Sequence, residues 1–388
     1  MPPQYPAAAQ VKFLHNSAGL YIHIPFCEKR CAYCDFYSAF LSEEMLDKYM
    51  QALHREIIKW GGTLDRPIDT IYIGGGTPSL LGERIVPLMK CIYENFDISE
   101  DAEITAEVNP GKSAEVFLKC AKQAGVNRIS IGAQSGDNGM LKVLGRTHTA
   151  EDTARAVSLA RAAGFLNISL DLMIGLPQST KESLGRDIDF IKKLEPEHIS
   201  AYILKLESDT AFGKKCEELG LPDDEGVAEQ YLYMCESLES AGFEHYEISN
   251  FSKPGYQSRH NLKYWLDQQY LGIGPAAHSF IDNRRFTNTE SIDEYVHCIL
   301  SGKVAEVFSE EVVGDDAKSE FTMLALRTVN GLDKNLYQKA FNSNFENDFA
   351  FAIKKNSKYL DISENFIKIK KEYLYVQNSI LVDFISER

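Results

Sequence analysis

The chain has 388 residues, a formal net charge of −15 and a pI near 5.2, and such an acidic balance argues against nucleic acid as a partner. Its hydrophobic content of 44% and charged content of 25% are ordinary for a soluble globular protein. No apolar run approaches the roughly 20 residues that cross a bilayer, so we expect no transmembrane segment. The start, MPPQYPAAAQVKF, lacks the pattern of a secretory signal, so we expect a cytoplasmic protein.

Short β-branched runs alternate with helical patterns in the first half of the chain. Strands are expected from Leu20, Thr70, Ala102, Arg128, Asn167 and His198. Helices are expected over residues 42–60 and 113–124, from Thr149 to Gly164, and from Thr180. Six strand–helix units predict an α/β fold with a parallel sheet, as an open, partial (β/α)6 barrel, with a doubly wound flat sheet as the alternative. We interpret the strands as continuous apolar runs, which are typical of strands covered on both faces.

The alternation stops after Leu206, and the length of the chain predicts more than one domain. A long helix is expected near residues 225–242, within a helical and irregular extension over residues 207–309. Residues 310–388 are expected to form a small α+β domain of winged-helix type, and residues 366–385 alternate like a hairpin. The prediction is therefore a core over residues 1–206, the extension, and the C-terminal domain.

Polar residues end five successive predicted strands. A cysteine-rich loop follows the first strand, and Gly74-Gly75-Gly76-Thr77-Pro78 follows the second. Glu107 and Asn109 end the third strand, Gln134 ends the fourth, and Asp171 lies within the fifth. Ligands of parallel α/β folds bind at the carboxyl ends of strands, so we expect one binding site at this end.

Three of the eight cysteines, Cys27, Cys31 and Cys34, lie within eight residues in the spacing C-x3-C-x2-C. Thiolates are soft ligands that suit iron–sulfur clusters or zinc, but no second Cys or His pair follows at zinc-finger spacing. A [4Fe–4S] cube held by three cysteines leaves one iron open. The other five cysteines are scattered, and we interpret them as small buried hydrophobes: Cys91, Cys120, Cys216, Cys235 and Cys298.

The stretch CEKRCAYC resembles the signature of the radical S-adenosylmethionine (SAM) superfamily. This resemblance implies a [4Fe–4S] cluster on Cys27, Cys31 and Cys34, with SAM chelating the open iron through its amine and carboxylate. GGGTP resembles the family's glycine-rich turn, which approaches SAM through its backbone because glycine has no side chain. The SAM-binding residues that the resemblance implies are Tyr21, Tyr33, Gly75, Gly76, Thr77, Glu107, Gln134, Arg146 and Asp171.

Five stretches together resemble the coproporphyrinogen III dehydrogenase-like branch of that superfamily over nearly the whole chain: YIHIPFCEKRCAYCDF, IYIGGGTPSLL, EVNP, DLMIGLP and GIGPAAHSF. In this branch, oxygen-independent dehydrogenases decarboxylate porphyrinogens, whereas HemW-type haem chaperones bind haem and pass it on. Three features favour the chaperones. Phe36 stands where the dehydrogenases carry a further cysteine, only about 20 residues precede the first strand, and HNLKYW from His260 to Trp265 resembles the chaperones' H-N-x-x-Y-W motif.

The resemblance implies haem as a further ligand. We expect neutral His260 to coordinate the iron, with Tyr264 and Trp265 against the porphyrin face. His278 is a second candidate ligand, and His23 is expected to be structural or near SAM.

Haem-requiring acceptor proteins, some of them membrane-bound respiratory enzymes, are the implied partners. A dehydrogenase remains the alternative, and whether SAM is cleaved stays open. A tRNA-modifying enzyme fits poorly, because no basic RNA-binding module is visible in the sequence.

Overall fold

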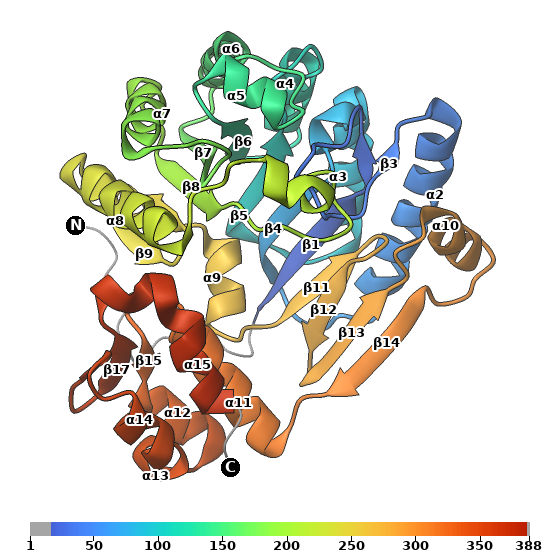
Figure 1. Ribbon diagram of the computed structural model, residues 1–388. Coiled ribbons are helices and arrows are strands. Elements are labelled where there is room, and N and C mark those ends of the chain that lie inside the picture. Colours follow the sequence, from blue (N-terminus) through green and yellow to red (C-terminus); the bar gives the residue numbers. More distant parts are fainter. Residues whose placement is uncertain (1–16, 386–388) are drawn as a thin grey trace.

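The computed structural model describes residues 17–385, so the predictions about the short N-terminal arm and the secretory signal lie outside the described residues. A 12-stranded sheet is the central element, in the order β14-β13-β12-β11-β1-β4-β5-β6-β7-β8-β10-β9 (Figure 1). Across residues 17–385, none of the helices combines the length and the apolarity that crossing a membrane requires.

Six parallel strands form the middle of the sheet: β1 (Ala18–Ile24), β4 (Ile68–Gly75), β5 (Ile98–Val108), β6 (Arg128–Gln134), β7 (Asn167–Ile174) and β8 (His198–Ile203). They are neighbours in the order in which they occur along the chain. Right-handed crossovers then place every connecting helix on the same face of the sheet. A doubly wound sheet would reverse its strand order at a switch point, so the order supports the partial barrel over the flat alternative.

The crossover helices lie along the outer side of these strands (Figure 1). They are α2 (Glu43–Gly61), η1 (Pro78–Arg84) with α3 (Ile85–Asn95), α4 (Ala114–Gln123), α5 (Asn138–Val143) with α6 (Ala150–Ala162), and α7 (Lys181–Lys193). Side chains cap several of them as the sequence predicts. The Thr149 hydroxyl accepts from the Asp152 amide at the start of α6, and the Asp152 carboxylate accepts from the Thr149 amide in return.

The inner face of the six strands is polar, and our interpretation of continuous apolar runs is therefore wrong. In β1, Leu20, Ile22 and Ile24 are fully buried in the core, while Tyr21 and His23 alternate with them. The same alternation recurs in β5, β6 and β7. Successive side chains of a strand point to opposite faces, so the apolar half packs under the helices and the polar half lines the barrel interior.

Residues 207–309 extend the central sheet, so the expectation of a helical and irregular segment is wrong in its secondary structure. After η2 (Gly213–Glu218) and α8 (Asp224–Ser240), β9 (Glu244–Glu247) and β10 (Asn250–Ser252) continue the sheet beyond β8. On the other side, β11 (Tyr270–Ile273), β12 (His278–Ile281), β13 (Arg284–Asn288) and β14 (Glu306–Glu311) continue it beyond β1, with α10 (Ile292–Leu300) between the last two. Helix α9 (Arg259–Trp265) joins β10 to β11 and so crosses from one side of the six strands to the other (Figure 1).

The C-terminal part has a hydrophobic core of its own, built around residues such as Tyr337, Phe345 and Ile367. Its helices are α11 (Gly314–Ala325), α12 (Lys334–Phe341), α13 (Phe345–Asp348), α14 (Ala350–Lys355), η3 (Lys371–Val376) and α15 (Gln377–Ile385). Its strands β15 (Leu332–Asp333), β16 (Leu360–Ile362) and β17 (Phe366–Ile369) form a second sheet. The part is α+β as expected, but the hairpin lies over residues 360–369, and the predicted strand beyond Ile369 is helical.

Candidate functional site

The three clustered cysteines lie in the loop around β2 (Phe26–Cys27) and β3 (Ala39–Phe40), at the carboxyl end of β1. All three are partly exposed. The Thr77 hydroxyl lies 3.6 Å from Cys27 Sγ, and Arg146 Nη1 lies 3.5 Å from Cys31 Sγ. Burial raises the pKa of Cys34 to about 11, and the charge of a bound metal would favour its thiolate. Three thiols on one loop beside a fixed cation fit an iron–sulfur cluster, although their binding of it stays a prediction.

The glycine turn packs directly on β1. Gly75 has φ +111°, and a Cβ there would lie 2.7 Å from the His23 ring. A Cβ on Gly76 would lie 2.6 Å from the Phe26 carbonyl oxygen, while its amide donates to the Ile24 carbonyl at 2.8 Å. Neither position admits a side chain, so the backbone of the turn is held against the loop that carries the cysteines.

Arg146 is fixed at the same end of the barrel by residues from two strands. Its Nη2 donates to Asn109 Oδ1 at 2.8 Å and to the Gly132 carbonyl at 3.0 Å. Asn109 also donates from Nδ2 to the Thr77 hydroxyl at 2.9 Å. Asn109 is therefore the bridge between the glycine turn and the guanidinium. We did not predict this role, although its place at the end of β5 is visible in the sequence.

Two half-buried carboxylates face the barrel interior below the turn. Glu107 accepts from the Tyr72 hydroxyl at 2.8 Å and from the Gly75 amide at 3.1 Å. Burial raises the pKa of Glu107 to about 7, with the charge of Asp171 adding to the shift. Asp171 accepts from Ser130 at 3.1 Å, and burial raises its pKa to about 6. Both carboxylates can accept from amine or hydroxyl donors of a ligand.

Three further predicted residues complete this end. The Tyr21 hydroxyl lies 2.9 Å from His23 Nδ1. Tyr33 packs against an apolar cluster that includes Leu144 and Met173. Gln134 ends β6 with φ +65°, an uncommon conformation for a residue other than glycine and one that often marks a functional site. The residues predicted to bind the cluster and SAM thus lie together, and their binding of SAM stays a prediction.

The HNLKYW motif lies at the opposite end of the barrel. The His260 amide donates to Glu103 Oε1 at 3.1 Å, and its Nδ1 lies 2.9 Å from the Thr70 hydroxyl. Thr70 and Glu103 belong to the amino-terminal parts of β4 and β5, since Gly75 and Glu107 lie further along these strands. The cysteines and the motif therefore approach the sheet from its two different ends.

His260 is closed off from solvent. Its side chain is 1% exposed, its Nε2 lies 2.9 Å from the Tyr264 hydroxyl, and burial lowers its pKa to about 3. Both imidazole nitrogens are therefore engaged, and coordination of iron would require the bond to Tyr264 to break. The Trp265 indole N–H has no hydrogen-bond partner within residues 17–385, and Arg327 lies 5.9 Å from the indole ring. The haem-binding role of the three motif residues stays a prediction.

The other two candidate histidines, His23 and His278, differ in their exposure to solvent. His23 is 6% exposed beside the glycine turn, and burial lowers its pKa to about 4. His278 is exposed at the start of β12.

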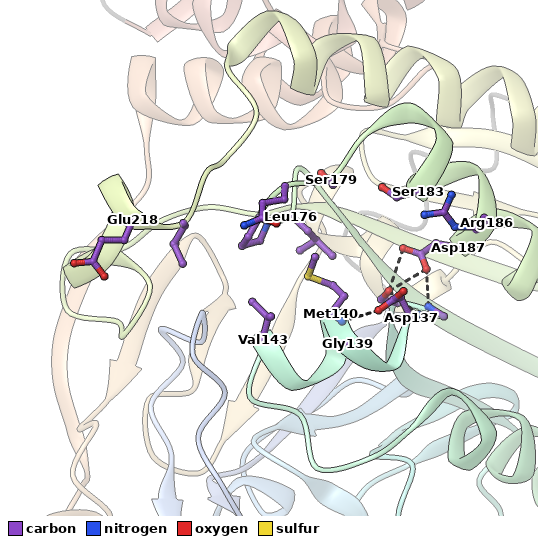
Figure 2. A pocket seen from close by; sticks show the side chains of 15 residues that line it. Asp137, Gly139, Met140, Val143, Leu176, Ser179, Ser183, Arg186, Asp187 and Glu218 are labelled. Carbon is purple, nitrogen blue, oxygen red and sulfur yellow. Dashed lines mark hydrogen bonds between the residues drawn. The ribbon is translucent and has the colours of Figure 1, made fainter.

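Sequence reasoning missed two cavities, because each forms between distant segments. The first, of about 600 Å³, lies beside α5 and α7, with Met140 and Leu176 among its apolar walls (Figure 2). At its base Asp187 accepts from the Ser135 hydroxyl at 2.9 Å and from the Gly136 amide at 2.7 Å (Figure 2). The second, of about 450 Å³, lies between the end of the HNLKYW motif and the C-terminal part.

The chain is similar to known proteins over most of its length. A family model described as the Radical SAM superfamily matches residues 21–191. The chain is 35% identical to Heme chaperone HemW of Bacillus subtilis, over 95% of this chain and 99% of that protein. It is 40% identical to Heme chaperone HemW of Escherichia coli, over 79% of this chain and 82% of that protein.

A solved structure supports the fold. The coproporphyrinogen III oxidase HemN of Escherichia coli, described as a radical SAM enzyme, superposes with a TM-score of 0.85 at 24% identity and covers 99% of this chain and 94% of that one. The superfamily implies a [4Fe–4S] cluster and SAM, and the donors gathered at the carboxyl end of the strands fit both. The resemblance found in the sequence is thereby confirmed, and the chain belongs to the HemW family of the radical SAM superfamily.

Proposed function

We propose that this protein is a haem chaperone, which binds haem and passes it to acceptor haemoproteins. The observation that carries the proposal is the identity of 35% to a protein named as a haem chaperone over 95% of this chain, which includes α9 and the C-terminal part. The presence of Phe36 in place of a further cysteine supports it against the dehydrogenase alternative.

At the carboxyl end of the barrel, Cys27, Cys31 and Cys34 would hold the [4Fe–4S] cluster, which when bound with SAM supplies one-electron chemistry. Thiolates suit iron, and hydrogen bonds fix the guanidinium of the half-buried Arg146 beside Cys31, so it would be ready to pair with a carboxylate.

The remaining residues of this end would hold the rest of SAM. Gly75, Gly76 and Thr77 present backbone without steric hindrance, and Glu107 and Asp171 offer acceptors to an amine or to ribose hydroxyls. Tyr21, Tyr33 and Gln134 border the same end and would limit the access of water.

Haem would bind at the other end, on the HNLKYW motif. Release of the Tyr264 hydroxyl would free Nε2 of the neutral His260 imidazole for iron, and Tyr264 and Trp265 would contact the porphyrin face. The acceptors would be haem-requiring proteins, membrane-bound respiratory enzymes among them, and we place the chaperone in the cytoplasm.

Titration of the purified protein with haemin tests the proposal. We expect a stoichiometric Soret shift in the wild type and a changed Soret spectrum in His260→Ala. A wild type without a Soret shift would refute haem binding. Anaerobic conversion of coproporphyrinogen to protoporphyrinogen would establish the dehydrogenase instead.

A further inference from the structure

Arg327 lies beside the HNLKYW motif, although it belongs to the C-terminal part of the chain. It follows the end of α11, and the next residue, Thr328, forms a backbone bridge with Glu247 of β9. This bridge holds the backbone of the turn against the central sheet. The side chain of Arg327 is thereby brought to Trp265, the last residue of the motif, with the guanidinium carbon 5.9 Å from the centre of the indole ring.

The Arg327 guanidinium lacks an acceptor in the part of the chain that the structure describes. The residue is half-buried, and within residues 17–385 its side chain makes no hydrogen bond or ion pair. Burial lowers the pKa of Arg327, as expected for a cation that is taken out of water without a partner. The buried indole N–H of Trp265 also has no acceptor among the described residues. Two donors without acceptors at one place indicate a site for an acceptor group of a ligand.

The two cations of α9 itself are engaged by acids. Lys263 pairs with Asp69 at 2.7 Å, and Arg259 pairs with Asp101 at 3.5 Å. Of these three cations beside the motif, Arg327 is therefore the one whose charge is available to an anionic ligand.

Glu247 acts on Arg327 through its charge without pairing with it. Its carboxylate is 1% exposed and accepts from the Ser249 amide at 3.2 Å and from the Asn250 side chain. Burial raises the pKa of Glu247 to about 7, so a large part of the group carries a proton at neutral pH. An anion beside Arg327 would therefore meet only part of the charge of this acid.

We propose that Arg327 binds a propionate of haem while the porphyrin contacts Trp265. This inference rests on the proposed haem chaperone function, and it leaves the iron on the HNLKYW motif. Haem carries two carboxylates at one edge of a flat apolar ring, so a cation beside an indole ring matches both its shape and its charge. In the haem-free protein the guanidinium lies over the indole ring. With haem bound it turns to the carboxylate, and the ring face passes to the porphyrin.

Haemin and its dimethyl ester, in which both propionates are uncharged, test the proposal. Soret titrations of the full-length protein give the dissociation constant of each ligand for the wild type and for Arg327→Gln, Arg327→Lys and Arg259→Gln. Arg259→Gln is the matched control, because this arginine lies on α9 and is already paired with Asp101. Circular dichroism of the haem-free variants checks that each one folds.

The wild type should bind haemin about tenfold or more tightly than the ester, because only haemin offers a carboxylate to the guanidinium. Arg327→Gln should bind both ligands as the wild type binds the ester. Arg327→Lys should keep part of the preference for haemin, because it keeps the charge without the fork of donors, and Arg259→Gln should keep all of it.

Four results would overturn the proposal. They are a wild type without a preference for haemin, an Arg327→Gln protein that retains the preference, an Arg327→Gln protein that loses both ligands equally, and loss of the preference in Arg259→Gln. A wild type that binds neither ligand would instead overturn the proposed function.

Discussion

Glu107→Gln should make the cofactor-free protein more stable at alkaline pH while it weakens SAM binding. The substituted side chain keeps both bonds of the carboxylate. Its oxygen can accept from the Gly75 amide, and its NH₂ group can donate to the Tyr72 hydroxyl, which can turn to accept. What the substitution removes is the charge of a half-buried group.

The size of the effect follows from the pKa of Glu107, which burial raises from 4.5 to about 7. Below 4.5 the group is protonated in both the folded and the unfolded chain, so it costs no stability there. As the pH rises from 4.5 to about 7 the unfolded chain ionises first and stability falls. At about pH 8 the ionised carboxylate costs the folded state about 3 kcal/mol, which Glu107→Gln should restore.

Urea denaturation of cofactor-free wild type and Glu107→Gln, at about pH 5 and about pH 8, measures this difference. We expect a stability gain of about 3 kcal/mol at the higher pH and less than about 1 kcal/mol at the lower pH. Glu83→Gln, an exposed carboxylate in η1, is the control and should stay within about 0.5 kcal/mol of the wild type. A Glu107→Gln protein that is no more stable at about pH 8 would refute the reasoning.

Three further substitutions test other contacts of the protein. Tyr72→Phe removes a hydrogen bond to the Glu107 carboxylate and should weaken SAM binding about tenfold in calorimetric titration. Cys31→Ser should lose the cluster, measured as bound iron and sulfide after anaerobic reconstitution, with the fold retained by circular dichroism. Glu56→Ala removes the carboxylate that accepts from the buried Tyr295 hydroxyl, Asn288 Nδ2 and the Gly274 amide, and should lower the free energy of unfolding by about 3 kcal/mol or more in urea.

The carboxyl-end site could be predicted because parallel strands bring their ends together. Cys27, Gly75, Glu107 and Asp171 are far apart in the chain, yet strand order alone places them at one end. The polar interior was equally visible, because alternation such as R-I-S-I from Arg128 assigns its polar half to one face. The β-branched residues alone do not reveal this alternation, because the polar residues lie between them.

Other features depend on packing that the sequence does not encode locally. The strands β9 to β14 are short, and β10 and β11 pair with the distant strands β8 and β1. No long β-branched run therefore marks them in the sequence. His260 looks like an available ligand in HNLKYW, but Thr70 and Tyr264 engage both its nitrogens. The cavity between the end of the HNLKYW motif and the C-terminal part exists because α11 packs near the end of α9.

Helix α9 ties the two flanks of the barrel together, because it connects β10 beside β8 with β11 beside β1. Its amides bond Glu103, and its Lys263 pairs with Asp69 at 2.7 Å inside the same end of the barrel. The motif is thus a connection between the two flanks, and its length limits the distance between them. A substitution in HNLKYW that removes these bonds is expected to weaken the connection between the two flanks at this end of the strands. Weaker haem binding by a motif variant would therefore need a measurement of stability beside it, because the same residues hold the two flanks together.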